Sequence, residues 1–314
     1  MANVAVLGYG TIGAGVVKVL QTNEAVITKR IGEKVEVKRI LDLRDFPGDP
    51  NEDKVVHDYA VIENDPDIDV VVECMGGVNP AYKFVKTALL QGRSVATSNK
   101  ELVASHGAEL IAIAAEKEIN FLFEASVGGG IPIIRPMISG LSADVIESVR
   151  GILNGTTNYM LTRMEEAGIS FDEALREAQE KGYAELHPEA DVDGYDACRK
   201  IAILTSIACE AQVDYEDIYT EGISRITAED ISYARIMKKT SVRSCHNRRM
   251  SAMAVKTNIN ACCVRNIITM IMPKQHIDIS FERQGPARPS QKRKEGFLAS
   301  SWNLVWREGS QFIT

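Results

Sequence analysis

A glycine motif close to the N-terminus constrains the fold of this chain more than any other feature. A short apolar segment, residues 3–7, runs directly into Gly8-Tyr9-Gly10-Thr11-Ile12-Gly13. The residues that follow have a helical apolar face, formed by Val16, Val17, Leu20 and Ile27. A G-x-G-x-x-G motif alone marks many tight turns, but a strand before it and a helix after it are typical of dinucleotide binding.

Each glycine of the motif has a separate role in such a site. The first permits the tight turn, the second lets the backbone approach a pyrophosphate, and the third lets the helix pack on the strand. The N-terminus of the helix then faces the phosphates. We therefore predict a dinucleotide site rather than a purely structural turn, and its residues are Gly8, Gly10, Thr11, Ile12 and Gly13.

Further strands alternate with helices along the first part of the chain. Apolar segments at residues 35–41, 68–73, 94–97 and 120–123 predict strands, and helices are expected from about Asn79 to Gly92 and from about residue 99 to Lys117. This alternation predicts a parallel sheet covered on both faces. Ligands of such sheets bind beyond the carboxyl ends of the strands, where Gly76-Gly77 and Lys100 fall. Lys100 is therefore a candidate site residue, although a surface cation is the alternative.

The end of the second strand carries signals for both nicotinamide cofactors. Asp42 is the kind of acid that holds the ribose hydroxyls of NAD, whereas Arg44 is the kind of cation that accommodates the 2′-phosphate of NADP. The sequence leaves this choice open. We assign Arg44 to the cofactor site.

The character of the sequence changes from Glu124, where E-A-S-V-G-G-G-I-P begins. Three glycines before Pro132 predict a loop with accessible backbone carbonyls, which suits a hard cation, a hinge or an interdomain bend with nothing bound. A helix over residues 133–141 and a strand over 145–153 are expected next, followed by the polar run Asn154–Asn158. We predict a Rossmann-type domain over residues 1–125 and an α+β substrate and dimerisation domain over 126–239.

The segment from Ala178 to Lys200 gathers titratable side chains around a loop that joins two helices. Pro188 and Gly194 break the helical periodicity. Asp196 and Lys200 are four residues apart and share a helical face, and Ala197, Ile201, Leu204 and Ala208 form the predicted buried face of the same helix. A lysine near several carboxylates can bind or protonate a small zwitterionic substrate, and a salt bridge on a solvated face is the alternative.

Composition and charge narrow the class of protein. The 314 residues suffice for two domains, and no apolar run approaches the roughly 18 residues of a membrane span. The six cysteines form no C-x-x-C pair and the N-terminus lacks a secretory pattern, so we expect a cytoplasmic protein without membrane contact. Residues 1–240 carry 24 Lys and Arg against 39 Asp and Glu, whereas residues 241–314 carry 12 against 4. This basic tail has no stripe or motif for nucleic acid, so no nucleic-acid partner is expected.

Several motifs together resemble the homoserine dehydrogenase family. They are G-Y-G-T-I-G, the tetrad Thr97-Ser98-Asn99-Lys100, the run Glu124–Pro132, the run Gly151–Tyr159, A-x-x-x-G-Y-A at 178–184 and P-x-x-D-V-x-G-x-D-x-x-x-K at 188–200. The resemblance covers about residues 1–239 in the family's order. His187 departs from the Asp, Asn or Ser that the family has before the proline. The tail 240–314 also departs, because the family's Gly-rich G-x-G-A-G return to the cofactor domain is missing there.

The resemblance implies NAD(P)-dependent interconversion of L-homoserine and L-aspartate 4-semialdehyde, in threonine, methionine and isoleucine biosynthesis. It implies that Lys200 exchanges a proton with the substrate oxygen, and that Lys100 lies between nicotinamide and substrate. It further implies a substrate site, a monovalent-cation (Na⁺) site and a homodimer. The implied substrate residues are Glu185, which would bind the ammonium group, with Asp191, Asp196, Asn154 and Thr156. The implied cation ligands are Glu124, Val127, Gly129 and Ile131.

Two other hypotheses remain open at this point. One is a catalytically impaired or non-catalytic nucleotide-binding relative, because the C-terminal part departs from the family. The other is a different dehydrogenase of a small amino acid or semialdehyde on the same scaffold. Zinc chemistry is disfavoured because no H-E-x-x-H motif is present.

Overall fold

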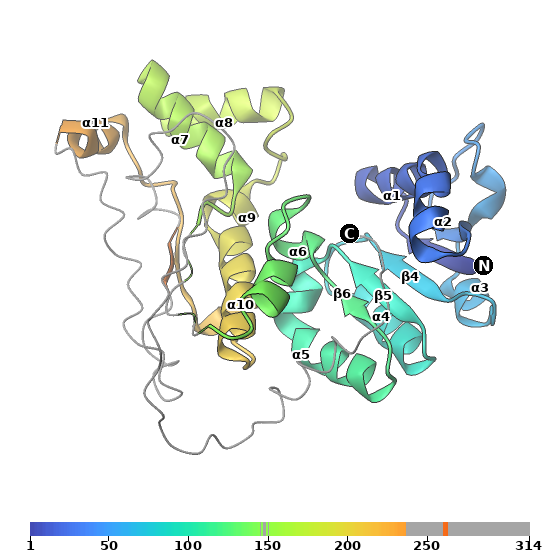
Figure 1. The fold of residues 1–314 in the computed structure, drawn as a ribbon. Coiled ribbons are helices and arrows are strands. Elements are labelled where there is room, and N and C mark those ends of the chain that lie inside the picture. Colours follow the sequence, from blue (N-terminus) through green and yellow to red (C-terminus); the bar gives the residue numbers. More distant parts are fainter. Residues whose placement is uncertain (145, 147–148, 150, 237–259, 263–314) are drawn as a thin grey trace, which may run out of the picture. The chain divides into compact units, whose positions relative to one another are not determined.

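The computed structural model describes residues 1–144, 146, 149, 151–236 and 260–262 of the chain (Figure 1). The chain forms two compact units, one from Met1 to Pro136 with Glu210–Gln212, and one from Met137 to Cys209 with the described residues from Val213 onward. The first unit extends past the predicted boundary at residue 125. It does so because the Glu124 carboxylate accepts hydrogen bonds from the backbone of residues 133–135, which ties that segment to the first unit. Almost all of the predicted tail, 240–314, lies outside the described residues.

A parallel sheet forms the centre of the first unit, as the sequence predicts, and it has a sixth strand, β3, besides the five that the apolar segments indicate. The strand order is β3-β2-β1-β4-β5-β6. The strands are β1 Ala2–Leu7, β2 Val35–Leu41, β3 Val55–Val56, β4 Val70–Glu73, β5 Ser94–Thr97 and β6 Phe121–Leu122. The order reverses between β1 and β4, which is the switch point where open α/β sheets bind ligands.

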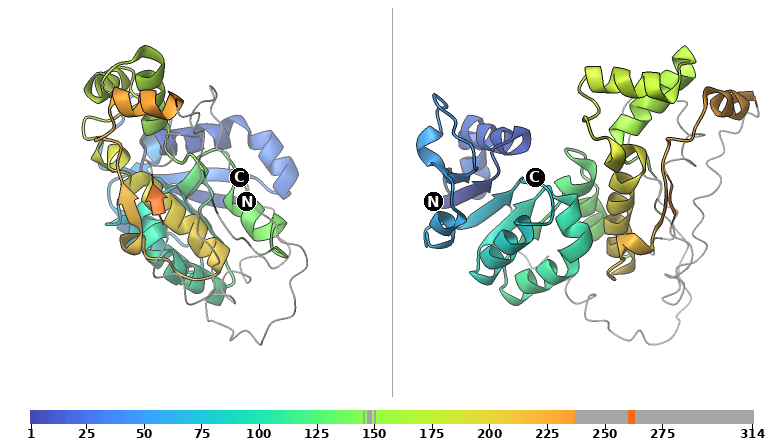
Figure 2. Two further views of the ribbon diagram at one scale, coloured as in Figure 1. Left: turned by 90° about the vertical axis from the view of Figure 1, so that its left-hand side faces the viewer. Right: turned by 180° about the vertical axis from the view of Figure 1, so that it is seen from behind.

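Helices cover both faces of this sheet. The helices are α1 Thr11–Thr22, α2 Glu24–Ile31, α3 Tyr59–Glu63, α4 Ala81–Leu90, α5 Lys100–Glu116 and α6 Ala125–Gly128, with a 3₁₀ turn η1 at Glu52–Lys54. Figure 1 shows α1 and α2 on one face and α4 and α5 on the other, and both views in Figure 2 agree. Such two-sided cover explains why the central strands β1 and β4 are almost continuously apolar up to Glu73.

Two helix boundaries differ from the prediction. The helix after the glycine motif ends at Thr22, and Ile27 belongs to the separate helix α2, because Asn23 leaves the helical conformation at φ −103° and ψ 15°. Helix α4 begins at Ala81 with Pro80 as its N-cap residue, rather than with Asn79 as the cap. The apolar side of α1 still packs on the sheet, where Val17 is buried with Val4, Val6 and Val37.

The second unit is mainly helical among the described residues. Its elements are α7 Gly155–Ala167, α8 Phe171–Glu180, α9 Glu189–Val192, α10 Tyr195–Cys209, the 3₁₀ turn η3 Tyr215–Asp217, β7 Tyr219–Glu221, α11 Ala228–Ile236 and β8 Asn260–Cys262. Strands β7 and β8 pair in parallel. Ser170 and Glu173 form a capping box at the start of α8.

Two further predictions concern residues 133–141 and 145–153. The helix expected over residues 133–141 is present as a helical segment over residues 134–140, of which Pro136–Gly140 form the π-helical turn η2. Part of the strand expected at 145–153 lies outside the described residues, and residues 151–153 form no strand.

Helix α10 is buried over more of its surface than predicted. Leu204 is fully buried as expected, but Ala197, Ile201 and Ala208 are only half-buried. Polar residues on other faces are buried as well, namely Asp196, Thr205 and Ser206. A helix buried on several faces must satisfy its polar groups within the protein, which bears directly on Asp196.

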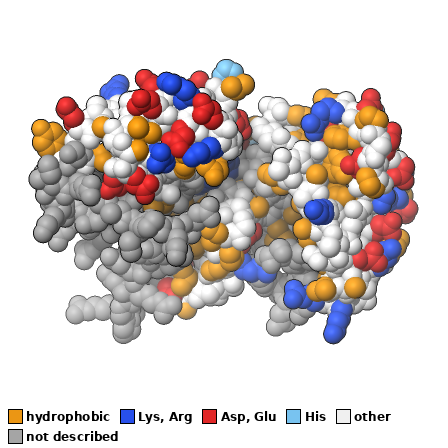
Figure 3. Space-filling model, turned by 90° about the horizontal axis from the view of Figure 1, so that it is seen from above, with side chains coloured by type: hydrophobic (Ala, Val, Ile, Leu, Met, Phe, Trp, Pro, Cys, Tyr) orange, Lys and Arg blue, Asp and Glu red, His pale blue; other side chains and the backbone are white. Residues whose placement is uncertain are grey.

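The surface of the described residues carries charges of both signs. On the face drawn in Figure 3, Lys and Arg side chains are interspersed with Asp and Glu side chains. Within the described residues, no helix has the length and apolar character needed to cross a membrane. The described part of the chain also holds no cluster of three or more His, Cys, Asp and Glu arranged to bind a metal ion.

Candidate functional site

The glycine turn has the geometry that its sequence predicts. Gly8 follows the last residue of β1 with φ +93°, a left-handed conformation that favours glycine. A Cβ on Gly13 would overlap the carbonyl oxygen of Gly8, so only glycine lets α1 approach the turn this closely. A Cβ on Gly10 would meet no protein atom within 4 Å. Gly10 therefore leaves room for a ligand rather than for protein.

Gly10 is also the N-cap residue of α1 and makes no side-chain cap. Thr11 and Ile12 are exposed in the first helical turn, whose N–H groups have no partners within the helix. An open cradle at the N-terminus of a 12-residue helix suits the pyrophosphate of a dinucleotide. The residues present thus fit such a cofactor.

Asp42 and Arg44 form a closely bonded pair at the end of β2. Asp42 Oδ1 accepts from the Arg44 backbone N–H at 3.0 Å and from Arg44 Nε at 2.9 Å. Asp42 Oδ2 accepts from the Tyr9 N–H at 2.8 Å and from Arg44 Nη2 at 3.0 Å. The bond from the Arg44 side chain is the main reason why the pKa of Asp42 lies far below its usual range. The carboxylate therefore holds the glycine turn and the guanidinium in place.

The Arg44 side chain remains open to a ligand although it is paired. It is 63% exposed, compared with 10% for the Asp42 side chain. Its guanidinium also lies over the ring of Phe46, 5.1 Å from the centroid, and Phe46 packs edge-on against Tyr9. A guanidinium fixed from one side and open on the other is well suited to an anion.

Lys100 is the first residue of α5, directly after the carboxyl end of β5. The N-cap residue Asn99 accepts from the Leu102 N–H at 3.1 Å and fixes the start of this helix. Lys100 thus lies at the ligand-binding edge of the sheet, as its sequence position predicts. Its role between nicotinamide and substrate stays a prediction.

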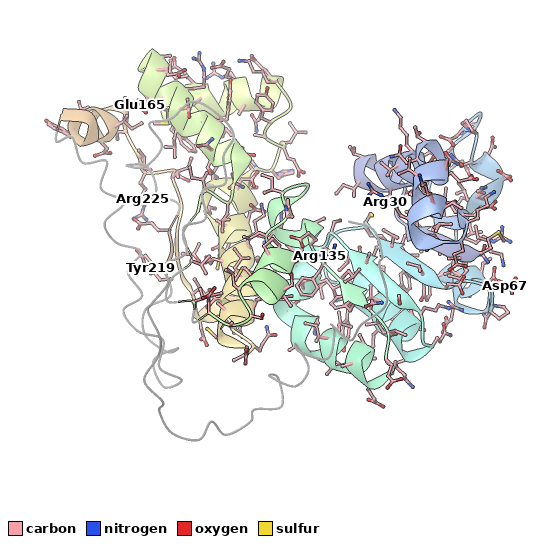
Figure 4. All side chains as sticks on the ribbon, viewed as in Figure 1. Arg30, Asp67, Arg135, Glu165, Tyr219 and Arg225 are labelled. Atoms are coloured by element: carbon pink, nitrogen blue, oxygen red, sulfur yellow. The ribbon has the colours of Figure 1, made fainter. Side chains whose placement is uncertain are left out.

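The predicted cation ligands lie around the short helix α6. Glu124 Oε1 accepts from the N–H groups of Ile133 and Ile134 at 2.6 and 2.7 Å, and Oε2 accepts from that of Arg135, labelled in Figure 4, at 2.8 Å. Val127 is buried, whereas Gly129 and Ile131 are exposed. Three of the roughly four acceptor positions of the carboxylate are therefore already used. The set fits a cation only if backbone carbonyls supply most of the ligands.

In the second unit, four predicted residues form one hydrogen-bonded chain. Lys200 Nζ donates to Asp196 Oδ2 and to the Leu153 carbonyl oxygen, both at 2.8 Å. Asn154 Nδ2 donates to the same Asp196 oxygen at 2.9 Å and to Asp191 Oδ1 at 2.7 Å. The Lys200 side chain is 17% exposed and that of Asp196 is 3% exposed. The carboxylate of this ion pair is buried and the ammonium is largely covered, which excludes a salt bridge on a solvated face.

Asn154 and Thr156 are engaged with the protein rather than open to a ligand. The Asn154 Oδ1 atom accepts from Thr157 N at 2.8 Å and Thr157 Oγ1 at 2.9 Å, which caps α7. Thr156 Oγ1 donates to the Tyr183 carbonyl oxygen at 2.8 Å. Glu185 is exposed, and its carbonyl oxygen accepts from Gln179 Nε2 at 3.0 Å. Ligation of the substrate by Asn154, Thr156, Glu185, Asp191 and Asp196 stays a prediction.

Sequence reasoning missed Glu73, the last residue of β4. Its side chain is fully buried and accepts from Thr97 Oγ1 at 2.5 Å and from the Met75 N–H at 2.7 Å. The signal was present, since a glutamate ends the otherwise apolar run V-V-V-E. A charged residue in a buried strand requires specific partners.

The comparisons with known proteins agree with this arrangement. A family model described as the NAD binding domain of homoserine dehydrogenase matches residues 8–124, and the model of homoserine dehydrogenase itself matches residues 132–273. A proposed homoserine dehydrogenase of solved structure, from Archaeoglobus fulgidus, is 32% identical with a TM-score of 0.68, and the match covers 76% of this chain and 78% of that one. The chain belongs to the homoserine dehydrogenase family. The family model reaches residue 273, past the limit of 239 that the motifs predict.

Longer members of the homoserine dehydrogenase family match the same part of the chain. The Bacillus subtilis homoserine dehydrogenase is 44% identical over 237 residues, which are 74% of this chain and 54% of that protein. The homoserine dehydrogenase structure from Thiobacillus denitrificans is 41% identical with a TM-score of 0.71, and the match covers 76% of this chain and 56% of that one. The chain thus spans about half the length of these relatives.

Proposed function

We propose that this chain is an NAD(P)-dependent oxidoreductase that interconverts L-homoserine and L-aspartate 4-semialdehyde. The observation that carries the proposal is the environment of Lys200. Its ammonium group has three N–H donors, and among the described residues it bonds to two oxygens, those of Asp196 and Leu153. The two bonds fix the group and leave one donor for the oxygen of a substrate.

The proton chemistry follows from this geometry. When an aldehyde is reduced, its oxygen must gain a proton, and a donor within hydrogen-bond reach is needed. Lys200 supplies that proton, and it takes the proton back in the direction of alcohol oxidation. The Asp196 carboxylate holds the ammonium in orientation, and Asn154 holds Asp196 and Asp191 at a fixed separation. Glu185, as an exposed carboxylate on the same segment, binds the substrate ammonium.

The cofactor supplies the hydride when it is bound. Gly10 and the first turn of α1 hold its pyrophosphate, and Lys100 contributes a positive charge near its nicotinamide end.

We propose NADP(H) rather than NAD(H) as the preferred cofactor, from the state of Asp42. Each carboxylate oxygen of Asp42 already accepts two N–H donors. A carboxylate offers about four acceptor positions in total, so none remains for the ribose hydroxyls of NAD. The exposed Arg44 guanidinium is suited to a 2′-phosphate instead.

The remaining parts of the proposal come from the family. We infer a homodimer formed through the second unit, a cytoplasmic location, and a role in threonine, methionine and isoleucine biosynthesis. A monovalent cation such as Na⁺ would lie at the carbonyl groups of Val127, Gly129 and Ile131, with Glu124 as its carboxylate. Light scattering of the purified chain tests the dimer, and turnover in Na⁺ buffer against a bulky organic cation tests the cation.

The decisive experiment for the activity is a matched pair of lysine variants. Lys200→Met removes the proposed proton donor, and Lys181→Met removes another lysine that pairs with a carboxylate four residues away, Glu177 at 2.6 Å. Oxidation of NADPH by aspartate 4-semialdehyde is followed with the full chain. We expect Lys200→Met to lower kcat about 10²-fold or more with unchanged NADPH binding, and Lys181→Met to keep its kcat. Equal kcat values for the two variants would remove Lys200 from the mechanism.

The cofactor preference has its own test. Arg44→Ala should raise the Kd for NADPH about tenfold to a hundredfold while changing the Kd for NADH much less, because a charge-assisted bond contributes roughly 1.5–3 kcal/mol. Fluorescence titration of both cofactors measures this. A parallel loss for NADH would contradict a 2′-phosphate contact.

A further inference from the structure

Glu73 is the fully buried carboxylate at the ligand-binding edge of the first unit. It ends β4, in register with Leu7 at the end of β1 and Thr97 at the end of β5. Its Oε1 atom accepts from the backbone N–H groups of Met75 and Gly76, at 2.7 and 3.4 Å. These bonds fold the loop after β4 back over the strand end.

The other carboxylate oxygen reaches the neighbouring loop through a relay. Thr97 Oγ1 donates to Glu73 Oε2 at 2.5 Å and accepts from the Asn99 backbone N–H at 2.9 Å. The Asn99 side chain then donates to the Gly77 carbonyl oxygen at 2.6 Å and caps α5. The bonds close a ring that joins the loop after β4 to the loop that begins α5 at Lys100.

The same loop also touches the glycine turn. A Cβ added to Gly8 would lie 3.1 Å from both the Cys74 carbonyl oxygen and Met75 Cγ. Glu73 thus acts on all three loops at the switch point: the glycine turn, the loop at 74–77 and the loop at 98–100. Because ligands of such sheets bind at this edge, the position of these loops sets the shape of the nicotinamide end of the site.

The burial of Glu73 indicates a specific purpose beyond sheet stability. Among the described residues, no Lys, Arg or His forms an ion pair with it, so its charge is offset by hydrogen bonds alone. A buried carboxylate costs several kcal/mol unless such bonds compensate, and an apolar residue would pack in the strand at lower cost. What an apolar residue lacks is a way to fix both loops.

We infer that Glu73 is a positioning residue, which holds the loops at 74–77 and 98–100, and with them Lys100, in the arrangement that hydride transfer needs. This inference rests on the proposed function. It assigns Glu73 no contact with substrate or cofactor, because its oxygens are already engaged with Met75, Gly76 and Thr97.

The test compares Glu73 with a buried polar residue at the amino ends of the same parallel strands. Arg93, just before β5, is 7% exposed and donates to the carbonyl oxygens of Ile62, Glu63 and Asp65. Glu73→Met and Arg93→Met each remove a buried hydrogen-bonding group, and both should lower thermal stability. Turnover of the full-length chain is measured at saturating NADPH, at a temperature where both variants are folded.

We expect Glu73→Met to lower kcat about tenfold or more, and Arg93→Met to leave kcat within about twofold. Hydrogen exchange of the Met75, Gly76 and Asn99 amides should accelerate only in Glu73→Met. Glu73→Gln should recover most of the activity, since its amide accepts from Met75 and donates to Thr97. Equal kcat losses in the two methionine variants, or no recovery by glutamine, would overturn the inference.

Two additions keep the test decisive. If Glu73→Met does not fold, Thr97→Val replaces it: faster exchange at Asn99 with lower kcat supports the relay, and wild-type values for both refute it. If the wild-type chain binds NADPH but turns over neither homoserine nor the semialdehyde, the proposed function fails. Amide exchange in the variants still decides the role of Glu73, because unchanged exchange at residues 75, 76 and 99 would refute it without reference to activity.

Discussion

Replacement of Gly13 by alanine tests the packing on which the cofactor site depends. The new Cβ would overlap the carbonyl oxygen of Gly8 and lie 3.4 Å from Val6 Cγ1. Ordinary C···O contacts are about 3.3 Å or longer, so α1 must move away from the turn by more than about 1 Å. Overpacking of this kind costs roughly 1–3 kcal/mol of stability.

The same movement displaces the N-terminus of α1 from the phosphates. A helix N-terminus contributes up to about 2 kcal/mol to the binding of an anion, and its loss corresponds to a Kd for NADPH that is raised about tenfold to thirtyfold. Fluorescence titration of NADPH and a thermal melt measure the two effects. We expect the Kd for NADPH to rise and the melting temperature to fall together.

Gly15→Ala is the matched control on the same helix, because a Cβ at Gly15 would lie within 4 Å of no neighbouring atom. Alanine is favoured over glycine inside a helix by roughly 0.8–1 kcal/mol, so this variant should be more stable and bind NADPH normally. If Gly13→Ala does not fold, Gly10→Ala replaces it, since its Cβ enters open space and should weaken NADPH binding without loss of stability. Wild-type NADPH affinity in the folded Gly13→Ala or Gly10→Ala variant would refute the proposed placement of the pyrophosphate.

Two further predictions concern the second unit. Asn154→Ala should lower stability by about 0.5–2 kcal/mol through loss of a helix cap, and it should also lower kcat/KM for homoserine. Ser170→Ala, which removes the exposed cap of α8, should affect stability alone. Equal kcat/KM values in both variants would contradict the role of Asn154. Hydrogen bonds from Lys181, Arg163 and Tyr159 lower the pKa of Glu177 to about 2 from its ordinary value of 4.5. Its carboxylate therefore stabilises the folded state fully above pH 4.5, and this contribution is lost as the pH falls toward 2. Thermal melts of wild type and Glu177→Gln should therefore differ above pH 4.5 and converge near pH 2, and a difference that is independent of pH would contradict this assignment.

The parallel sheet and its ligand-binding edge could be predicted from the sequence because they depend on periodicity. Apolar runs separated by helical segments define parallel strands, and the glycine motif identifies the turn by the close approach of Gly8 and Gly13. Elements too short to show periodicity were missed. Strand β3 has two residues and α3 has five, too few for a periodic signal. The break at Asn23 depends on one residue that leaves the helical conformation, which periodicity does not detect.

The roles of individual polar side chains were harder to predict than their positions. Sequence motifs placed Asn154 and Thr156 near the substrate, but a motif does not show which of their hydrogen-bonding atoms the protein itself uses. In the structure, the Asn154 amide bonds to Asp191, Asp196 and Thr157. The number of bonds that each group makes is fixed by tertiary packing, which brings together residues up to 42 positions apart.

Both units use internally bonded polar residues to orient a cation that stays open to a ligand. Asp42, Glu73 and Asn154 are polar residues of the kind usually assigned to ligands, yet their hydrogen-bonding capacity is largely engaged within the protein. Arg44 and Lys200 are each fixed by one of these networks and still retain N–H donors beyond those the protein uses. A group held in one orientation loses little conformational entropy when it binds, so the engaged residues increase the affinity of the ones that remain open. Substitution of Asp42 by alanine should then weaken NADPH binding although Asp42 itself contacts no phosphate, because Arg44 would lose its fixed orientation.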